Sequence, residues 1–337
     1  MSQFDRPRTA EAFRERYAGA DIELAYAGIN TFLKSEQREV EDLADVDAGV
    51  VGVPYDGAVS NRPGARYGPE AIRRASAWWA YISGYKGGLT NMRTGRQVDF
   101  NRLSIADCGD VPLFPMDREK TAESISAYVA TIADQAFPVV LGGDHYCTFP
   151  AFRGFAEGTD HDTIGLVQVD AHTDTVQESA LFGEHFHGSS TNLIAESPHT
   201  DFEHVSQVGI RGYESPEFFE FADETGLNLF TAHDIRERGV RDVVSEAVEA
   251  AAEDADAVYV TFDIDGVDPS VAPGTGTPIP GGLTADQALA TMEVLGGHDA
   301  VGAVDLMEVA PRYDGTEGTS RLAAYLLITL LERQFAE

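Results

Sequence analysis

The sequence predicts an α/β protein in which a mostly parallel sheet lies between two layers of helices. Apolar, β-branched runs recur from about residue 46 onward, and amphipathic helical patterns separate them. Continuous apolar strands are typical of parallel sheets covered on both faces, because neither face of such a sheet meets water. A closed barrel fits the same periodicity, since periodicity alone does not distinguish an open sheet from a closed one.

The elements follow in order along the chain. Eight strands are expected, at residues 47–53, 103–108, 138–142, 164–170, 205–210, 227–231, 257–264 and 301–307. Helices are expected at 69–77, 119–136, 215–225, 240–254, 284–296 and 318–334. The aromatic-rich segment 75–97 suits either a helix face in the core or the rim of a pocket. Residues 1–45 are expected to form an arm suited to packing on a neighbouring subunit, and residues 46–337 a single domain.

The charge of the chain restricts its partners. Asp and Glu number 56 against 24 Lys and Arg, which gives a formal net charge of −32. Such a surface repels nucleic acid and anionic membranes, so neither is expected as a partner. Acids spread along the whole chain indicate a solvated shell suited to high salt, as in halophilic proteins. The N-terminus is charged and no run of eighteen apolar residues exists, which favours a cytoplasmic location.

The two cysteines, Cys108 and Cys147, are expected to be reduced and buried.

Metal-binding residue types gather where three predicted strands end. Asp170, His172 and Asp174 are spaced by two, so in an extended backbone their side chains point the same way. Asp263 and Asp265 repeat this spacing on another strand, and His145 follows a third. Ligands of α/β sheets collect at the carboxyl ends of strands. We therefore expect one site built from two imidazoles and four carboxylates.

Six such ligands indicate two metal ions rather than one catalytic ion with an open position. Oxygen-rich sites with some imidazole suit Mn²⁺ and tolerate Ni²⁺, and no thiolate is present to favour a softer ion. Two ions share carboxylates at roughly 3.5–4 Å separation in binuclear hydrolases. Taken singly, each motif has a plainer interpretation as a turn, a helix cap or an exposed acidic loop. All three together, each at the end of an apolar strand, are hard to obtain by chance.

At these residues the sequence resembles the arginase–agmatinase (ureohydrolase) family. The resemblance covers about residues 45–335 and includes GGDH, DAHTD and the run FDIDGVDPSVAPGTGTPIPGGLT at 262–284. It implies a three-layer α/β/α sandwich with an eight-stranded, mostly parallel sheet. It also implies a homo-oligomer, trimeric or hexameric, that releases urea from a guanidino compound at two divalent ions.

The resemblance assigns roles by motif. One ion is expected to be held by His145, Asp170, Asp174 and Asp263, and the other by Asp170, His172, Asp263 and Asp265. Asp170 and Asp263 would then bridge the ions. FGEHFHG matches a segment ending in His-Gly, which implies that His187 shuttles protons; the plainer interpretation is a loop histidine. VDLMEVAPRYD matches the segment with the guanidinium-binding glutamate, which implies that role for Glu308 rather than a surface strand end.

Departures from the family pattern concern the substrate. Tyr146 replaces a small residue, and Ser189-Ser190 replaces Thr-Pro.

Among candidate substrates, agmatine ranks first because a cationic tail suits an acidic chain better than an α-amino acid does. Second is 4-guanidinobutyrate, since YAGINTFLK at 26–34 is similar to a guanidinobutyrase phrase; its carboxylate needs a cation such as Arg211 or Arg312. Free guanidine is third, if an aromatic side chain (Trp78, Trp79, Tyr81 or Tyr146) fills the space of a tail. A formiminoglutamate hydrolase, a one-zinc deacetylase and a non-catalytic binding protein are the rival classes.

Overall fold

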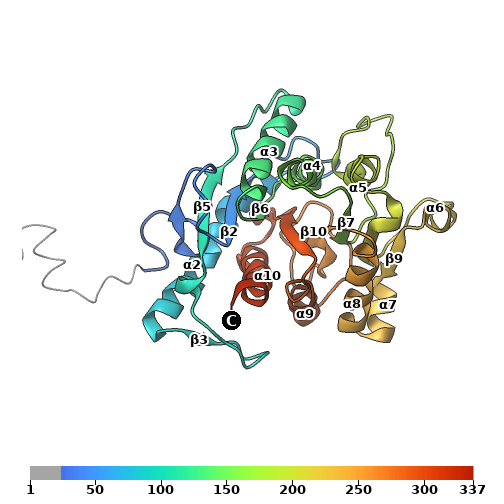
Figure 1. The fold of residues 1–337 in the computed structure, drawn as a ribbon. Helices are drawn as coiled ribbons and strands as arrows, with labels where there is room; N and C mark the ends of the chain where they lie inside the picture. The colour runs from blue at the N-terminus through green and yellow to red at the C-terminus, as the bar shows by residue number, and fades with distance from the viewer. Residues whose placement is uncertain (1–23, 337) are drawn as a thin grey trace, which may run out of the picture.

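A computed structural model describes residues 24–336, in which an open sheet of nine strands forms the middle layer (Figure 1). All pairings in this sheet are parallel. The strands, in spatial order, are β1 (Glu36–Gln37), β5 (Ile105–Asp110), β2 (Ala48–Gly52), β6 (Phe137–Leu141), β11 (Val301–Met307), β10 (Ala257–Asp263), β7 (Ile164–Val169), β8 (Val205–Ile210) and β9 (Asn228–Thr231). The sheet ends at β1 and β9 and does not close, so the barrel alternative is wrong.

Helices cover both faces of the sheet. Figure 1 shows α3, α4 and α5 on one side and α8, α9 and α10 on the other, as predicted for a three-layer sandwich. The α-helices of the described chain are α2 (Gly68–Lys86), α3 (Arg118–Ala133), α4 (Thr148–Gly158), α5 (Ser190–Ala195), α6 (Phe218–Thr225), α7 (Ala232–Arg238), α8 (Val240–Ala251), α9 (Ala285–Leu295) and α10 (Gly318–Phe335). None of these described helices is long and apolar enough to cross a membrane.

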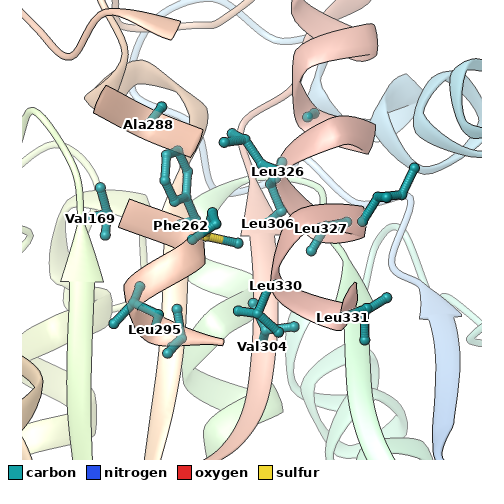
Figure 2. Close-up of a cluster of buried hydrophobic side chains, with 14 of the residues drawn as sticks. Val169, Phe262, Ala288, Leu295, Val304, Leu306, Leu326, Leu327, Leu330 and Leu331 are labelled. Atoms are coloured by element: carbon teal, nitrogen blue, oxygen red, sulfur yellow. The ribbon is translucent and has the colours of Figure 1, made fainter. Parts of the chain in front are cut away.

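The central strands are buried on both faces. Every residue of β7 and of β10 is buried, which explains why their sequences are mostly apolar. Side chains alternate along each strand, so Phe262 and Leu306 face α9 and α10 (Figure 2). In the same close-up Leu326 and Leu330 of α10 pack over these strands. This packing holds β10 and β11 against α9 and α10, and the predicted ligands lie at the carboxyl ends of these central strands.

Helix ends follow local chemistry. The N-cap Thr284 accepts from the backbone N–H of Gln287, and the Gln287 side chain accepts from the backbone N–H of Thr284, which starts α9. Helix α2 ends where Gly87 adopts a left-handed φ of 70°. It therefore runs nine residues past the predicted end at 77. The rest of the segment 75–97 forms an antiparallel hairpin of β3 (Leu89–Thr90) and β4 (Gln97–Val98).

The described part of the N-terminal segment lies against the sheet edge and α2. Phe32 is fully buried, and its backbone N–H donates to the carboxylate of Asp107 at 2.7 Å. The backbone N–H of Leu33 donates to Ser76 of α2 at 2.8 Å. Residues 1–23 of the predicted arm lie outside the described residues, and packing of the arm on a neighbouring subunit stays a prediction.

Candidate metal centre

The six predicted ligands converge where adjacent strands end. Strands β6, β11, β10 and β7 are neighbours and run parallel, so their carboxyl ends lie at one edge of the sheet. His145 opens the short helix η4 (His145–Cys147) after β6, and Asp170 directly follows β7. Asp263 ends β10, and Asp265 lies in η7 (Ile264–Gly266) behind it. Segments more than a hundred residues apart in sequence thus form one cluster.

One group of ligand atoms surrounds His145. Its Nδ1 lies 2.8 Å from a carboxylate oxygen of Asp174, 3.0 Å from Asp170 and 3.5 Å from Asp263. The imidazole is 1% exposed, yet this Nδ1 makes no hydrogen bond. A buried nitrogen facing three carboxylate oxygens without a hydrogen bond is the arrangement that a bound cation would satisfy.

A second group surrounds His172. Its Nδ1 lies 3.2 Å from Asp265 and 3.5 Å from Asp170. Asp170 belongs to both groups, with Oδ2 toward His145 and Oδ1 toward His172. One carboxylate with an oxygen on each side suits a bridge between two ions. Asp263 is part of the first group only, so its expected bridging role is not tested by these distances.

The electrostatics of the cluster demand positive charge. Burial raises the pKa of Asp263 well above its usual value, and the nearby charges of Asp265 and Asp170 raise it further. Burial lowers the pKa of His172, but the charge of Asp265 and the hydrogen bonds of the two carboxylates outweigh it and raise that pKa to about 12. Cations stabilise closely packed buried carboxylates of this kind, and divalent metal ions supply the charge most compactly.

Beside the cluster, His187 and Glu308 form a buried pair. The Nδ1 of His187 lies 2.9 Å from Oε1 of Glu308, which also accepts from the backbone N–H of His145 at 3.1 Å. The other carboxylate oxygen, Oε2, is buried and has no hydrogen-bond partner. Glu308 is fully buried at a left-handed φ of 62°, a conformation that a non-glycine residue adopts only when its surroundings enforce it. A buried carboxylate oxygen without a hydrogen-bond partner, beside this cluster of candidate ligands, suits a cationic substrate group.

The second histidine of the same loop faces elsewhere. His185 packs edge-on against Tyr146 at 5.9 Å and beside Phe149 at 6.3 Å. Arg118 donates to its backbone carbonyl at 2.8 Å. Of these two histidines, His187 is the one that contacts Glu308, which agrees with the choice of His187 over His185.

The aromatic side chains of α2 lie apart from the cluster. Trp78 and Tyr81 line a separate cavity of about 500 Å³, which includes none of the predicted ligands. Trp79 packs against Tyr325 of α10 at 4.8 Å. These contacts place Trp78, Trp79 and Tyr81 against other parts of the described chain, so they lend no support to free guanidine as the substrate. Tyr146 is 3% exposed and packed beside His185.

Three contacts to the predicted residues were not expected from the motifs. Gln168 donates to Asp170 at 2.7 Å, and Thr261 lies 2.9 Å from Nε2 of His145. Ser60 lies 2.6 Å from Nε2 of His187. A polar residue inside an apolar strand was the available signal for Gln168 and Thr261, whereas Ser60 lies in a loop with no such contrast.

Comparison with known proteins agrees with this geometry. A family model described as "Arginase family" matches residues 46–332. Agmatinase from Chromobacterium violaceum is 37% identical over 94% of this chain and 92% of its own length. Guanidinobutyrase from Pseudomonas aeruginosa is 36% identical over 91% of this chain and 92% of its own length. The crystal structure of a hypothetical agmatinase from Burkholderia thailandensis superimposes with a TM-score of 0.79 at 34% identity, covering 93% of each chain. The chain therefore belongs to the arginase family of ureohydrolases.

Proposed function

We propose that this chain hydrolyses a guanidino compound to urea and an amine at two divalent metal ions, with agmatine as the substrate we rank first. The observation that carries the proposal is the shared carboxylate of Asp170, placed between a His145 group and a His172 group. Membership of a family that depends on binuclear metal sites supports it. Mn²⁺ is the ion we expect, and Ni²⁺ is the second choice, because the ligands are oxygen and imidazole.

The residues fit two ions by charge as well as by position. Asp170, Asp174, Asp263 and Asp265 carry four negative charges, which two divalent cations neutralise. When bound, such ions lower the pKa of water and polarise the atoms around them. We assign one ion to the His145 side and one to the His172 side of the cluster.

Glu308 is proposed to bind the guanidinium. Its Oε1 is already fixed by His145 and His187, while Oε2 has no hydrogen-bond partner. A guanidinium donating to Oε2 would complete this buried carboxylate with a charge-assisted hydrogen bond. The reacting carbon would then lie between Glu308 and the metal cluster.

His187 is proposed to supply the proton for the leaving amine. Burial lowers the pKa of His187, but the hydrogen bond and charge of Glu308 outweigh burial and raise it to about 9. This shift favours the protonated form of the ring, which is the form that a proton donor needs. Proton donation by a positioned side chain of this kind accelerates reactions by roughly 10²–10⁴-fold.

The surroundings of the site favour a cationic tail over a carboxylate. Arg211, one of two expected carboxylate receptors, is half-buried and donates to backbone carbonyls that include those of Ile279, Asp265 and Gly209. It is thus engaged in holding loops together. Arg312 is exposed and lies over the ring of Tyr313, so it remains the receptor that 4-guanidinobutyrate would need.

Rival functions lack comparable support. Asp174 lies in the His145 group and Asp265 in the His172 group, so both groups have their carboxylates, whereas a one-zinc deacetylase would need only one group. A binding protein without activity would be expected to have lost ligands, and all six are present. The homo-oligomer, the cytoplasmic location and adaptation to high salt stay predictions from the resemblance, the N-terminus and the net charge of −32.

Urea release from a panel of substrates tests the proposal. The panel contains agmatine, 4-guanidinobutyrate, guanidine, arginine and formiminoglutamate, each with Mn²⁺ or Ni²⁺ in molar KCl. Fastest urea release from agmatine is the expected result. Fastest release from 4-guanidinobutyrate or guanidine would replace the substrate but keep the chemistry. Hydrolysis of arginine above all others would contradict our ranking, and no urea from any compound would contradict the function.

A further inference from the structure

Four buried polar side chains form a row across the sheet. On β7 and β10 this row lies two residues before the predicted ligands Asp170 and Asp263. Gln207 of β8 pairs in register with Gln168 of β7, Gln168 with Thr261 of β10, and Thr261 with Asp305 of β11. All four are at most 1% exposed. Burying polar groups in a sheet costs free energy unless they are hydrogen bonded, so this polar row calls for an explanation beyond packing.

Gln168 contacts the shared ligand. It precedes Asp170 by two residues, so both side chains lie on the same face of the strand. Its Nε2 donates to Oδ2 of Asp170 at 2.7 Å, while the backbone N–H of His172 donates to Oδ1 at 2.7 Å. Each carboxylate oxygen thus receives one N–H and keeps capacity for one further partner. This pair of donors fixes the plane of the carboxylate, with Oδ2 toward His145.

The amide of Gln168 is itself held in one orientation. Its Oε1 accepts from the hydroxyl of Thr191 at 2.7 Å and from Nε2 of Gln207 at 2.7 Å. Two donors on the oxygen leave only the NH₂ group to face Asp170. Gln207 is fixed in turn, because it also donates to the backbone carbonyl of Thr173.

Thr261 acts in the same way on the histidine. Its hydroxyl lies 2.9 Å from Nε2 of His145 and 3.1 Å from the hydroxyl of Thr148. A histidine that binds a metal through Nδ1 carries its proton on Nε2, which donates to a neighbouring acceptor. Thr261 is therefore placed to fix both the tautomer and the ring orientation that turn Nδ1 toward Asp170 and Asp174.

We infer that Gln168 and Thr261 are positioning residues that aim Asp170 Oδ2 and His145 Nδ1 at one and the same metal ion, the ion on the His145 side. The inference rests on the proposed function, since it requires that two ions bind. The two ions would then differ in what orients their ligands. Gln168 and Thr261 orient the ligand atoms on the His145 side, whereas the backbone N–H of His172 orients the other oxygen of Asp170. Loss of an outer hydrogen bond of this type typically weakens metal affinity by roughly 10–100-fold.

Mn²⁺ binding to the metal-stripped full-length chain tests this assignment. Free Mn²⁺ is counted by its electron paramagnetic resonance signal, and the dissociation constant of each ion is obtained from the titration. Gln168→Met and Thr261→Val remove the hydrogen bonds with little change in volume. Each is expected to weaken one ion by roughly 10–100-fold and to leave the other within about threefold. Thr191→Val, which frees the Gln168 amide, should weaken the same ion less, and it carries the test if Gln168→Met does not fold.

Single-ion backgrounds identify the ion affected. In Asp265→Asn, which should retain the His145-side ion, adding Gln168→Met is expected to abolish the remaining binding at micromolar Mn²⁺. In Asp174→Asn, which should retain the His172-side ion, the same addition is expected to change little. A matched control is Gln135→Met, because this partly buried glutamine holds the backbone carbonyl of Val40 far from the cluster.

The outcomes separate the two proposals. Fewer than two Mn²⁺ ions per wild-type chain would overturn the proposed function. Two ions in the wild type, with both weakened equally or neither weakened by Gln168→Met and Thr261→Val, would overturn the positioning role alone. Either role lowers the melting temperature of the metal-free chain, because Thr191 and Gln207 lose a buried acceptor. Only a positioning role also predicts a smaller rise in melting temperature on adding Mn²⁺.

Discussion

Replacing His187 by Asn removes the proposed proton donor while keeping a polar group in the loop. The imidazole lies 2.9 Å from Glu308 and is 8% exposed, and it is not among the groups that could hold a metal. We therefore expect His187→Asn to retain both ions and to lose turnover. Loss of a general acid predicts a decrease of roughly 10²–10⁴-fold in kcat.

The pH dependence of kcat tests the role of His187 independently. Glu308 raises the pKa of His187 to about 9 against the opposing effect of burial, so the protonated donor is present at neutral pH and is lost as pH rises through that value. Bound divalent cations repel the imidazolium and lower its pKa, so the alkaline decrease in kcat should lie below pH 9 in the loaded enzyme. His187→Asn should lack this decrease.

The assay measures urea release across pH 6–10, with metal content determined on the same samples. His185→Asn is the matched control, because that histidine packs on Tyr146 and Phe149 and makes no contact with Glu308 among the described residues. It should keep kcat within a few-fold. Full turnover in His187→Asn together with loss in His185→Asn would refute the assignment.

Three further predictions follow from the ligand geometry and the charge. Asp265→Asn should lose the His172-side ion preferentially, because the Asp265 carboxylate belongs to that group alone; equal loss of both ions, measured by elemental analysis, would contradict the division. Glu308→Gln should lower kcat/KM by roughly 30-fold or more, since weakening a buried charge pair costs about 2 kcal/mol at least, and metal content should not change. The melting temperature should rise by roughly 5 °C or more between 0.1 M and molar KCl, as screening relieves the net charge of −32; a flat or falling melting temperature would contradict it.

The fold was largely readable from the sequence because the central strands are buried and mostly apolar. All eight expected strands are present, and the ninth, β1, was missed because Glu36 and Gln37 are polar and the strand has only two residues. Helix α4 was missed because it begins directly after the His145 segment with no linker. Helices α5 and α7 have six and seven residues, too few for a periodic pattern.

The sequence predicted the candidate ligands, but it did not predict the side chains that form hydrogen bonds to them. Spacing by two indicated that Asp170 and His172 belong together, and the strand ends indicated the common edge. Contacts such as Gln168 with Gln207 depend on which strands are neighbours and in which register, and the sequence does not contain that order explicitly. The pairing of His187 with Glu308 likewise joins residues 121 positions apart.

Metal content of the active enzyme, measured with urea release on the same preparation, tests the central claim most directly. Full-length protein is purified, stripped, reloaded with Mn²⁺ and freed of excess ion before elemental analysis. Two Mn²⁺ ions per chain, with urea release lost on stripping and restored on reloading, is the predicted result. A fully active chain that holds a single zinc ion, or that keeps its activity with no metal, would contradict the binuclear mechanism.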